Sequence, residues 1–391
     1  MRVLYLTMNP NRESTTVPTE GWFKVLRTQG LEPVLVSNKA GSFQVWARAE
    51  GIPCYEVPLP GPSRRRPLPF LRSLARILRI ARRHDIELVH CNEHDIYPIG
   101  QYAARLLRVP VMLSVHFTLR DGYSKWAFRG PRCPNRILFI SRGNLEACRP
   151  DVEPVIPQAR WRILYNGIDF DRFRPDAELR SAFRIEHGLG DDLAIGVACA
   201  LRPRKQLEHL FEAAAALPFP ALRIVVAGAA VAGDERYAEQ LLARGKQLLG
   251  DRLVHIGHLR DLRPFYNALD LFVNTSQEEA CSISVIEALA CGCPIVGYPS
   301  TSVDEQVLPS GGEIVAQDAV ADLASALNRW LADSARLTAA RPAARSHAES
   351  MFDIRHLAGK LWAEYASVLD EGRRRAETGR TRIEVHDHVG R

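Results

Sequence analysis

The sequence has no long apolar run and no paired cysteine motif. No apolar stretch in its 391 residues reaches the ~18 residues that a membrane-spanning helix needs, so any membrane contact is expected at the surface. The eight cysteines are scattered without a repeated CxxC pair, and the strand-like start MRVLYLT is too short for a signal peptide. We therefore expect a cytoplasmic protein with reduced thiols rather than a disulfide-stapled secreted one.

Lysine is scarce, and arginine supplies nearly all of the formal net charge of +6. Because the excess is modest and acidic residues are interspersed, it does not indicate nucleic-acid binding, but it suits anionic small molecules or an anionic membrane surface. We expect no metal site. Asp169-Phe-Asp171 lies in a loop expected to be structural, and His386-Asp-His388 has no further ligand nearby.

Short β-branched or apolar runs alternate with amphipathic stretches along most of the chain. In the first half the runs cover residues 3–7, 33–36, 88–89, 111–115 and 136–140. In the second half they cover residues 194–199, 223–227, 253–256, 271–274 and 294–296. This alternation predicts an α/β fold with two Rossmann-like, doubly wound parallel-sheet domains in tandem.

The domain boundary is expected near the loop Asn166-Gly-Ile-Asp169. We expect one Rossmann-like domain over residues 1–172 and a second over residues 173–350. A helix at about 351–368 would pack back on the first domain, and residues 371–391 form a polar tail expected to be flexible. Since ligands of open parallel sheets gather beyond the carboxyl ends of the strands, the chemistry is expected in an interdomain cleft.

Residues 276–294 carry two carboxylates, Glu279 and Glu287, on either side of small or apolar residues. A strand at 271–274 and a helix at 283–291 would place residues 279–284 at the helix N-terminus, where unpaired N–H groups and the helix dipole favour an anion. A structural interpretation competes, because Ser284-Val-Ile-Glu287 matches the capping-box pattern. Spacing alone does not decide between the two.

Three ordered motifs resemble one enzyme family. Residues 276–296, taken with residues 166–175 and 200–206, resemble the retaining GT-B glycosyltransferases of glycosyltransferase group 1, also called family 4. The resemblance covers roughly residues 1–365, and it implies that residues 1–172 form the acceptor-side domain and residues 173–350 the nucleotide-sugar donor-binding domain. It implies a metal-independent enzyme that moves a sugar from a nucleoside-diphosphate sugar, UDP- or GDP-linked, to a hydroxyl acceptor with retention. No cofactor is implied besides this co-substrate. The acceptor would be a glycan, a glycolipid or a small-molecule glycoside.

The resemblance also implies roles for the second-half residues. Glu279 would contact the sugar hydroxyls and Glu287 the ribose hydroxyls, and Lys205 would neutralise the leaving diphosphate. Many members have an arginine where Ala200 stands, and we expect Arg202, rather than Arg204, to supply that charge. The sugar and diphosphate would be held by Ala280, Cys281, Ser282, Ile283 and Ser284, and the base by His258 and Leu259.

In the first half, His116 follows a strand where the family usually has a histidine that contacts the donor sugar. By this resemblance His116, Glu279 and Lys205 are the expected catalytic residues. The first loop departs from the family's glycine pair, so Arg12, Thr15 and Thr16 would offer side-chain donors to the diphosphate or serve the acceptor. A second basic, aromatic loop with Tyr123, Lys125 and Trp126 suits an acidic sugar or a lipid phosphate, although an ordinary loop fits it equally.

Residues 63–84 are basic and amphipathic, with Leu71, Leu74, Leu78 and Ala81 on one face. They fit a core-packed helix with a solvated arginine face, and they also fit an interfacial helix in peripheral contact with anionic lipid at the inner face of a membrane. Two other functions stay open. One is a sugar-nucleotide epimerase or hydrolase on the same fold, and the other is a catalytically inactive nucleotide-sugar-binding protein.

Overall fold

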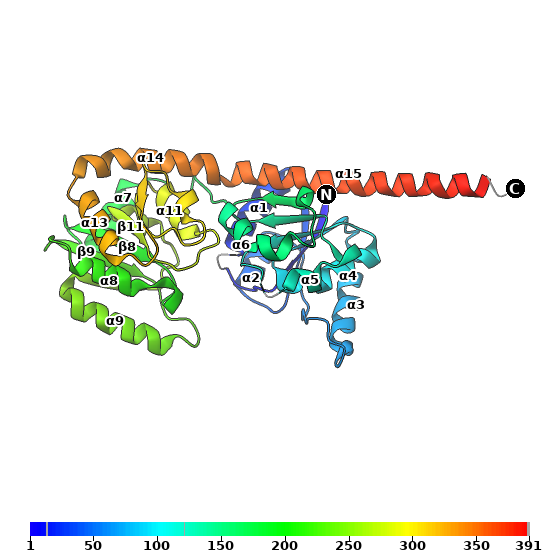
Figure 1. Cartoon of the computed structure of the whole chain (residues 1–391), viewed down its shortest axis with the longest axis horizontal. Helices are drawn as coiled ribbons and strands as arrows, with labels where there is room; N and C mark the ends of the chain where they lie inside the picture. Colours follow the sequence, from blue (N-terminus) through cyan, green and yellow to red (C-terminus); the bar gives the residue numbers. More distant parts are fainter. Residues whose placement is uncertain (13–14, 121, 389–391) are drawn as a thin grey trace. The chain divides into compact units, whose positions relative to one another are not determined.

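The computed structural model describes residues 1–12, 15–120 and 122–388, with the side chains of Pro131 and of residues 375–388 set aside. The chain divides into two compact units (Figure 1). Unit 1 comprises Met1–Gly167 together with Ile354–Arg391, and unit 2 comprises Ile168–Asp353. Among the described helices, none has both the length and the apolar character needed to cross a bilayer.

Unit 1 is built on a seven-stranded parallel sheet with the order β3-β2-β1-β4-β5-β6-β7. Its strands are β1 (Arg2–Thr7), β2 (Glu32–Ser37), β3 (Cys54–Glu56), β4 (Leu88–Cys91), β5 (Val111–Val115), β6 (Arg136–Phe139) and β7 (Trp161–Ile163). The strands alternate with helices α1 (Val17–Thr28), α2 (Ser42–Ala49), α3 (Pro67–Arg83), α4 (Tyr97–Leu107), α5 (Tyr123–Ala127) and α6 (Arg142–Val152). The central strands β1, β4 and β5 are almost entirely buried, as expected for a sheet covered on both faces.

The last helix, α15 (Ile354–His388), packs against α1 of unit 1. Leu357, Leu361 and Tyr365 join a buried cluster that contains Trp22 and Phe23 of α1. The Tyr365 hydroxyl is also hydrogen-bonded to Nδ1 of His90, at 2.6 Å. Residues that follow unit 2 in sequence therefore complete the core of unit 1.

Unit 2 is built on a six-stranded parallel sheet with the order β10-β9-β8-β11-β12-β13. Its strands are β8 (Leu193–Ala198), β9 (Leu222–Ala227), β10 (Leu253–Gly257), β11 (Leu271–Asn274), β12 (Ile295–Gly297) and β13 (Gly312–Ile314). Its helices are α7 (Ala177–Glu186), α8 (Leu207–Ala215), α9 (Glu235–Leu249), α10 (Arg263–Ala268), α11 (Ile283–Ala290), α12 (Val303–Gln306), α13 (Val320–Leu331) and α14 (Ser334–Phe352). Both sheets confirm the predicted fold class of two Rossmann-like domains.

Three strands escaped sequence reasoning, and all three are short strands at the edge of a sheet. β3 and β7 border the sheet of unit 1, and β13 borders that of unit 2. Each has three residues. β3 and β7 each include a polar side chain, Glu56 and Arg162, and each has residues that lie partly exposed. A three-residue run carries too little periodicity to be distinguished from a loop.

Gly228, which follows β9, is the position where we expect the fold to be least tolerant of a side chain. Its φ is +153°, and a Cβ atom there would lie 1.8 Å from the carbonyl oxygen of Cys199. Gly228→Ala is therefore expected to lower the free energy of unfolding by about 3 kcal/mol or more, measured by urea denaturation. Gly188→Ala is the control, because Gly188 has φ +62° with nothing within 4 Å, and a left-handed conformation alone costs about 1 kcal/mol. Equal losses in the two variants would contradict the importance of the close backbone approach.

Candidate active site

Two loops at the carboxyl edge of the unit 2 sheet are joined by hydrogen bonds. The loop after β8 carries Lys205, and the loop after β11 carries Thr275 and Gln277. The Thr275 hydroxyl donates to the carbonyl oxygen of Lys205 at 2.8 Å, and the Gln277 N–H donates to the carbonyl oxygen of Arg204 at 2.8 Å. Two motifs more than 70 residues apart in the chain therefore form one continuous surface.

Lys205 and Glu279 form an ion pair on this surface. The Nζ atom of Lys205 contacts Oε1 of Glu279 directly, and the two side chains are only 12% and 14% exposed. The backbone of Glu279 is also held, because the Ser302 hydroxyl donates to its carbonyl oxygen at 3.0 Å. A largely buried carboxylate needs such a partner, since water no longer solvates its charge. The pair thus brings together two of the residues predicted to act on a ligand.

The N-terminus of α11 lies directly after Glu279. Ser282 is the N-cap residue, and the N–H groups at the start of the helix have no intrahelical acceptor. Gln306 braces this turn from α12. Its Oε1 accepts from the Ser282 N–H at 3.3 Å, and its Nε2 donates to the Ser282 carbonyl oxygen at 3.2 Å. Ala280, Ser282 and Ser284 carry small side chains, which suits a close approach of phosphate oxygens to the backbone.

Glu287 does not close the capping box that the sequence pattern suggested. The helix begins at Ile283, so Ser284 is already inside it, and Ser282 makes no side-chain cap hydrogen bond. Instead, Oε2 of Glu287 accepts a hydrogen bond of 2.8 Å from the hydroxyl of Tyr266 in α10. The Glu287 side chain is buried, and this burial raises its pKa to about 7 against the opposing effects of Tyr266 and Arg172. The predicted capping box was therefore wrong, because Glu287 pairs with the Tyr266 hydroxyl and not with the N–H of a cap residue.

The remaining predicted donor residues lie at the same sheet edge but do not join the Lys205–Glu279 pair. Nε of Arg202 donates to Oδ2 of Asp234 at 3.2 Å, just ahead of α9. His258 and Leu259 follow β10, the first exposed and the second half-buried. Arg202 is thus engaged by a carboxylate that sequence reasoning did not consider.

In unit 1, His116 follows β5 and is almost completely buried. Its Nε2 lies 3.1 Å from Oδ1 of Asn92, and its Nδ1 has no hydrogen-bond partner among the described residues. Burial, with a smaller contribution from the nearby His94, lowers the pKa of His116 to about 4. The ring is therefore neutral at physiological pH and offers an uncharged nitrogen to a ligand.

Sequence reasoning missed Asn92 and Glu93, which follow β4 next to His116. The Glu93 carboxylate accepts hydrogen bonds from the Thr7 hydroxyl at 2.8 Å, from the Met8 N–H at 2.9 Å and from the Asn92 amide at 2.8 Å. Burial raises the pKa of Glu93 to about 7, although these three donors oppose the rise. The available signal was the polar run Asn92 to Asp95 directly after a buried strand, at the edge where parallel sheets bind ligands.

The predicted residues of the first loop are tied within unit 1. Nε and Nη2 of Arg12 donate to the two carboxylate oxygens of Glu20, at 2.6 and 2.8 Å. The Thr16 hydroxyl donates to the Asn11 carbonyl oxygen at 2.6 Å, and the Thr15 hydroxyl accepts from the Asn9 amide at 3.3 Å. The loop therefore uses these side chains to hold its own conformation.

The other predicted acceptor residues occupy the short helix α5. The Tyr123 hydroxyl bonds to the carbonyl oxygen of His94, and its ring lies 5.7 Å from that of Trp126 in an edge-on arrangement. Lys125 is exposed, and Trp126 is 47% exposed. The Trp126 ring therefore presents a large apolar surface to solvent, next to the exposed Lys125, and such a surface can bind a ligand.

Two family models match the chain. The model described as glycosyl transferases group 1 matches residues 180–347, which lie in unit 2. The model described as glycosyltransferase family 4 matches residues 24–172, most of which lie in unit 1. Together they cover the sheet of unit 2, every strand of the unit 1 sheet except β1, and every loop described above except the first.

Named relatives were found among bacterial enzymes. The chain is 28% identical over 227 residues to the lipopolysaccharide core biosynthesis mannosyltransferase LpsB of Rhizobium meliloti, covering 53% of this chain and 61% of the relative. It is 30% identical over 228 residues to a GDP-mannose-dependent alpha-(1-6)-phosphatidylinositol monomannoside mannosyltransferase of Mycolicibacterium smegmatis, covering 56% of this chain and 59% of the relative. The chain thus spans less than two thirds of the length of these relatives.

The fold also matches solved structures. Anabaena HepE in complex with UDP superimposes with a TM-score of 0.83 at 20% sequence identity, covering 94% of this chain and 100% of the other. At this identity the match establishes the shared fold of the two chains.

The Lys205–Glu279 pair predicts an energetic coupling between the two loops of unit 2. In a double-mutant cycle of Lys205→Met and Glu279→Gln, we expect a coupling of about 1–3 kcal/mol in the free energy of unfolding, because either single change leaves a charge largely buried without its partner. The matched control is the pair Lys246 and Asp251, whose side chains are 60% and 98% exposed. Little coupling is expected there. Additive effects at Lys205 and Glu279, measured by urea denaturation, would show that the two charges do not depend on each other.

Proposed function

Because the chain belongs to the glycosyltransferase group 1 family, we propose that it transfers a sugar from a nucleoside-diphosphate sugar to a hydroxyl acceptor. The observation that carries this proposal is the Lys205–Glu279 ion pair beside the N-terminus of α11. It combines a cation, a carboxylate and helix N-terminal N–H groups that have no intrahelical acceptor on one surface. These are the groups that a phosphorylated sugar would need, since the phosphate requires donors and the sugar hydroxyls require an acceptor.

The proposed donor roles follow from the chemistry of each group. The N–H groups of residues 280–284 would hold the diphosphate, and Lys205 would neutralise the charge that develops on the leaving group. Glu279 would then accept hydrogen bonds from the sugar. Glu287, further along α11, would accept both ribose hydroxyls, with the base near His258 and Leu259. Arg202 would assist the diphosphate only after leaving Asp234.

We also propose that transfer is retaining and metal-independent, as the family resemblance implies. Lys205 and the helix N-terminus would supply the positive charge that a metal supplies in other transferases. In unit 1, the neutral His116 would contact the donor sugar through a ring nitrogen. Arg12, Thr15, Thr16 and the α5 residues Tyr123, Lys125 and Trp126 would line the acceptor side.

The names of the relatives indicate which classes of donor and acceptor this chain would use. Two of them are mannosyltransferases, one named for GDP-mannose, and the structure of HepE contains UDP. We propose a GDP- or UDP-linked hexose as donor. Since the same relatives are named for lipopolysaccharide core and phosphatidylinositol monomannoside, we propose a glycolipid or glycan as acceptor, reached in the cytoplasm at the inner face of the membrane.

A thermal-shift screen of UDP, GDP, ADP and their sugars tests the donor proposal directly. A ligand present at about 100 times its dissociation constant adds roughly 2.7 kcal/mol of stability, which is readily measured as a rise in Tm. Product analysis with an acceptor library then tests transfer. The absence of any shift would refute nucleotide-sugar binding. Binding with hydrolysis or epimerisation but no transfer, or binding with no turnover, would identify one of the two alternative functions.

Glu287→Gln is predicted to keep the fold and to weaken donor binding about tenfold. The glutamine oxygen still accepts from Tyr266, whereas the loss of the charge weakens hydrogen bonds to the ribose hydroxyls by ~1.4 kcal/mol or more. Affinity for the nucleotide sugar found in the screen is measured by isothermal titration calorimetry. Glu239→Gln, at an exposed position of α9, is the control and should bind like the wild type.

The same contact predicts a pH dependence. Burial raises the pKa of Glu287 to about 7, so its carboxyl group becomes protonated as the pH falls through 7. If the ionised form binds ribose, wild-type affinity should rise between pH 6 and 8 and then level off. The Glu287→Gln variant should be flat over that range. A wild-type affinity independent of pH, together with unchanged binding by the variant, would remove Glu287 from the donor site.

A further inference from the structure

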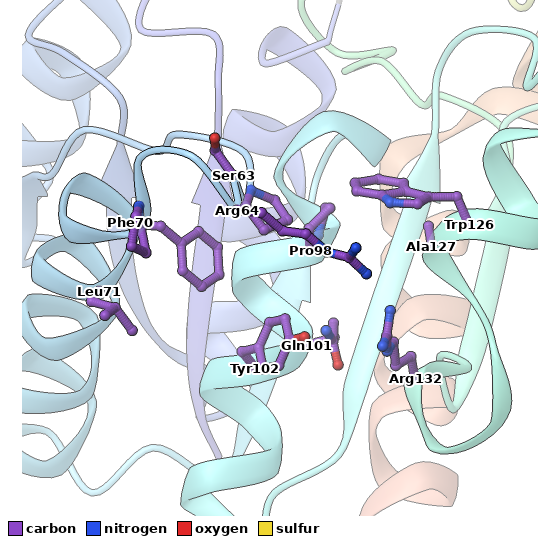
Figure 2. Close-up of a pocket in the computed structure, with 12 residues that line it drawn as sticks. Ser63, Arg64, Phe70, Leu71, Pro98, Gln101, Tyr102, Trp126, Ala127 and Arg132 are labelled. Atoms are coloured by element: carbon purple, nitrogen blue, oxygen red, sulfur yellow. The ribbon is translucent and has the colours of Figure 1, made fainter.

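Unit 1 contains a cavity of about 390 Å³ that none of the proposed donor roles uses. It lies between the start of α3 with the loop before it, α4, α5 and the short helix Gly130–Arg132 (Figure 2). This volume falls within the roughly 300–1,000 Å³ of pockets that hold small molecules. The pocket is therefore large enough for one small ligand.

One part of the pocket is cationic. Arg64 and Arg132 both line it, and Figure 2 shows their guanidinium groups turned toward the same space. Neither guanidinium forms an ion pair with a carboxylate among the described residues, and no acidic residue lines the pocket. Two arginines without carboxylate partners favour an anion with several oxygens, since the planar guanidinium group matches phosphate geometry.

Apolar side chains line the pocket in two places, Phe70 and Leu71 on α3 and, nearer to Arg132, Trp126 and Ala127 on α5 (Figure 2). Phe70 and Ala127 are buried, while Leu71 and Trp126 are 53% and 47% exposed. These side chains come from α3 and α5, which follow different strands of the sheet. A ligand with an apolar portion would cover both exposed side chains, which water now contacts at a cost in free energy.

The side chain of Gln101, on α4, adds an amide group to the lining of the pocket. Gln101 of α4 is only 5% exposed, yet its side chain forms no hydrogen bond with a described residue. Figure 2 shows its amide between Tyr102 and Arg132. An amide carries both donors and an acceptor, so Gln101 offers a hydrogen bond to a polar ligand group next to Arg132.

We propose that this pocket binds one molecule of a phosphorylated amphiphile. The phosphate would lie between Arg64 and Arg132 within reach of the Gln101 amide, and the apolar chain would lie against Phe70, Leu71 and Trp126. The inference deepens the acceptor role proposed for Trp126 and rests on the proposed function in that respect, but binding at this pocket requires neither donor nor turnover, so its failure is distinguishable from a failure of sugar transfer. The same chemistry is offered by a lipid in a membrane and by a soluble amphiphilic phosphate.

The test uses the full chain and decanoyl lysophosphatidic acid below its critical micelle concentration. Binding is measured by isothermal titration calorimetry against two comparators, inorganic phosphate and monodecanoylglycerol. The lysophosphatidic acid is expected to bind at least about tenfold more tightly than either comparator, because only it satisfies both parts of the pocket. Equal affinity for inorganic phosphate, or no binding of the amphiphile, would overturn the proposal.

Two double variants distinguish binding in the pocket from general electrostatic attraction of the anionic ligand to the arginines of α3. Arg64→Ala/Arg132→Ala should weaken lysophosphatidic acid binding by about tenfold or more, as expected for charge-assisted hydrogen bonds. Arg82→Ala/Arg83→Ala removes the same charge from the last turn of α3, outside the pocket, and should change binding less than about twofold. Equal losses in the two variants would overturn the pocket.

A third variant and a vesicle experiment complete the design. Trp126→Ala should weaken binding of the lysophosphatidic acid and leave that of inorganic phosphate unchanged, and an unchanged amphiphile affinity would contradict the apolar half of the site. Sedimentation with phosphatidylcholine vesicles containing phosphatidic acid distinguishes the sources. Selective loss in Arg64→Ala/Arg132→Ala indicates a membrane lipid, whereas no vesicle binding alongside tight monomer binding indicates a soluble amphiphile.

Discussion

The carboxylate of Glu279 is largely buried and requires a cation beside it. The arrangement of the candidate donor site depends on the ion pair that it forms with Lys205. The side chain is only 14% exposed, and Lys205 reaches it from a loop that follows a different strand. Hydrogen bonds from the Thr275 hydroxyl and the Gln277 N–H to backbone carbonyl oxygens hold the two loops against each other. A charge pair with little access to water is strong only when its geometry is fixed. The hydrogen bonds between the loops supply that fixed geometry.

Burial also shifts the pKa of the other ionisable groups, upward for the acids and downward for the base. It raises the pKa of Glu287 and of Glu93 to about 7, and it lowers that of His116 to about 4. Desolvation disfavours whichever form is charged, so carboxyl groups hold their protons longer and imidazole rings lose theirs sooner. Groups tuned in this way at the carboxyl edge of a parallel sheet are candidates for function.

The pattern of short apolar runs was enough to predict both sheets, because parallel strands buried on both faces are continuous and hydrophobic. The strand at 271–274 and the helix that begins at residue 283 were placed correctly to within a residue. The capping box failed for a geometric reason. The true cap is Ser282, two residues earlier, so Glu287 projects toward Tyr266 on a neighbouring helix. A local motif does not specify such a partner 21 residues away.

The sequence by itself determined the fold class and the order of the longer strands along the chain, and its resemblance to a family indicated the two motifs that carry Lys205 and Glu279. These features depend on periodicity and on residue types within short windows. Only the tertiary structure decided that Arg202 pairs with Asp234, that Asn92 links Glu93 to His116, and that four separate helices and a loop line a cationic and apolar pocket. Each depends on which segments the sheet brings together, and contacts between distant segments leave no trace in local spacing.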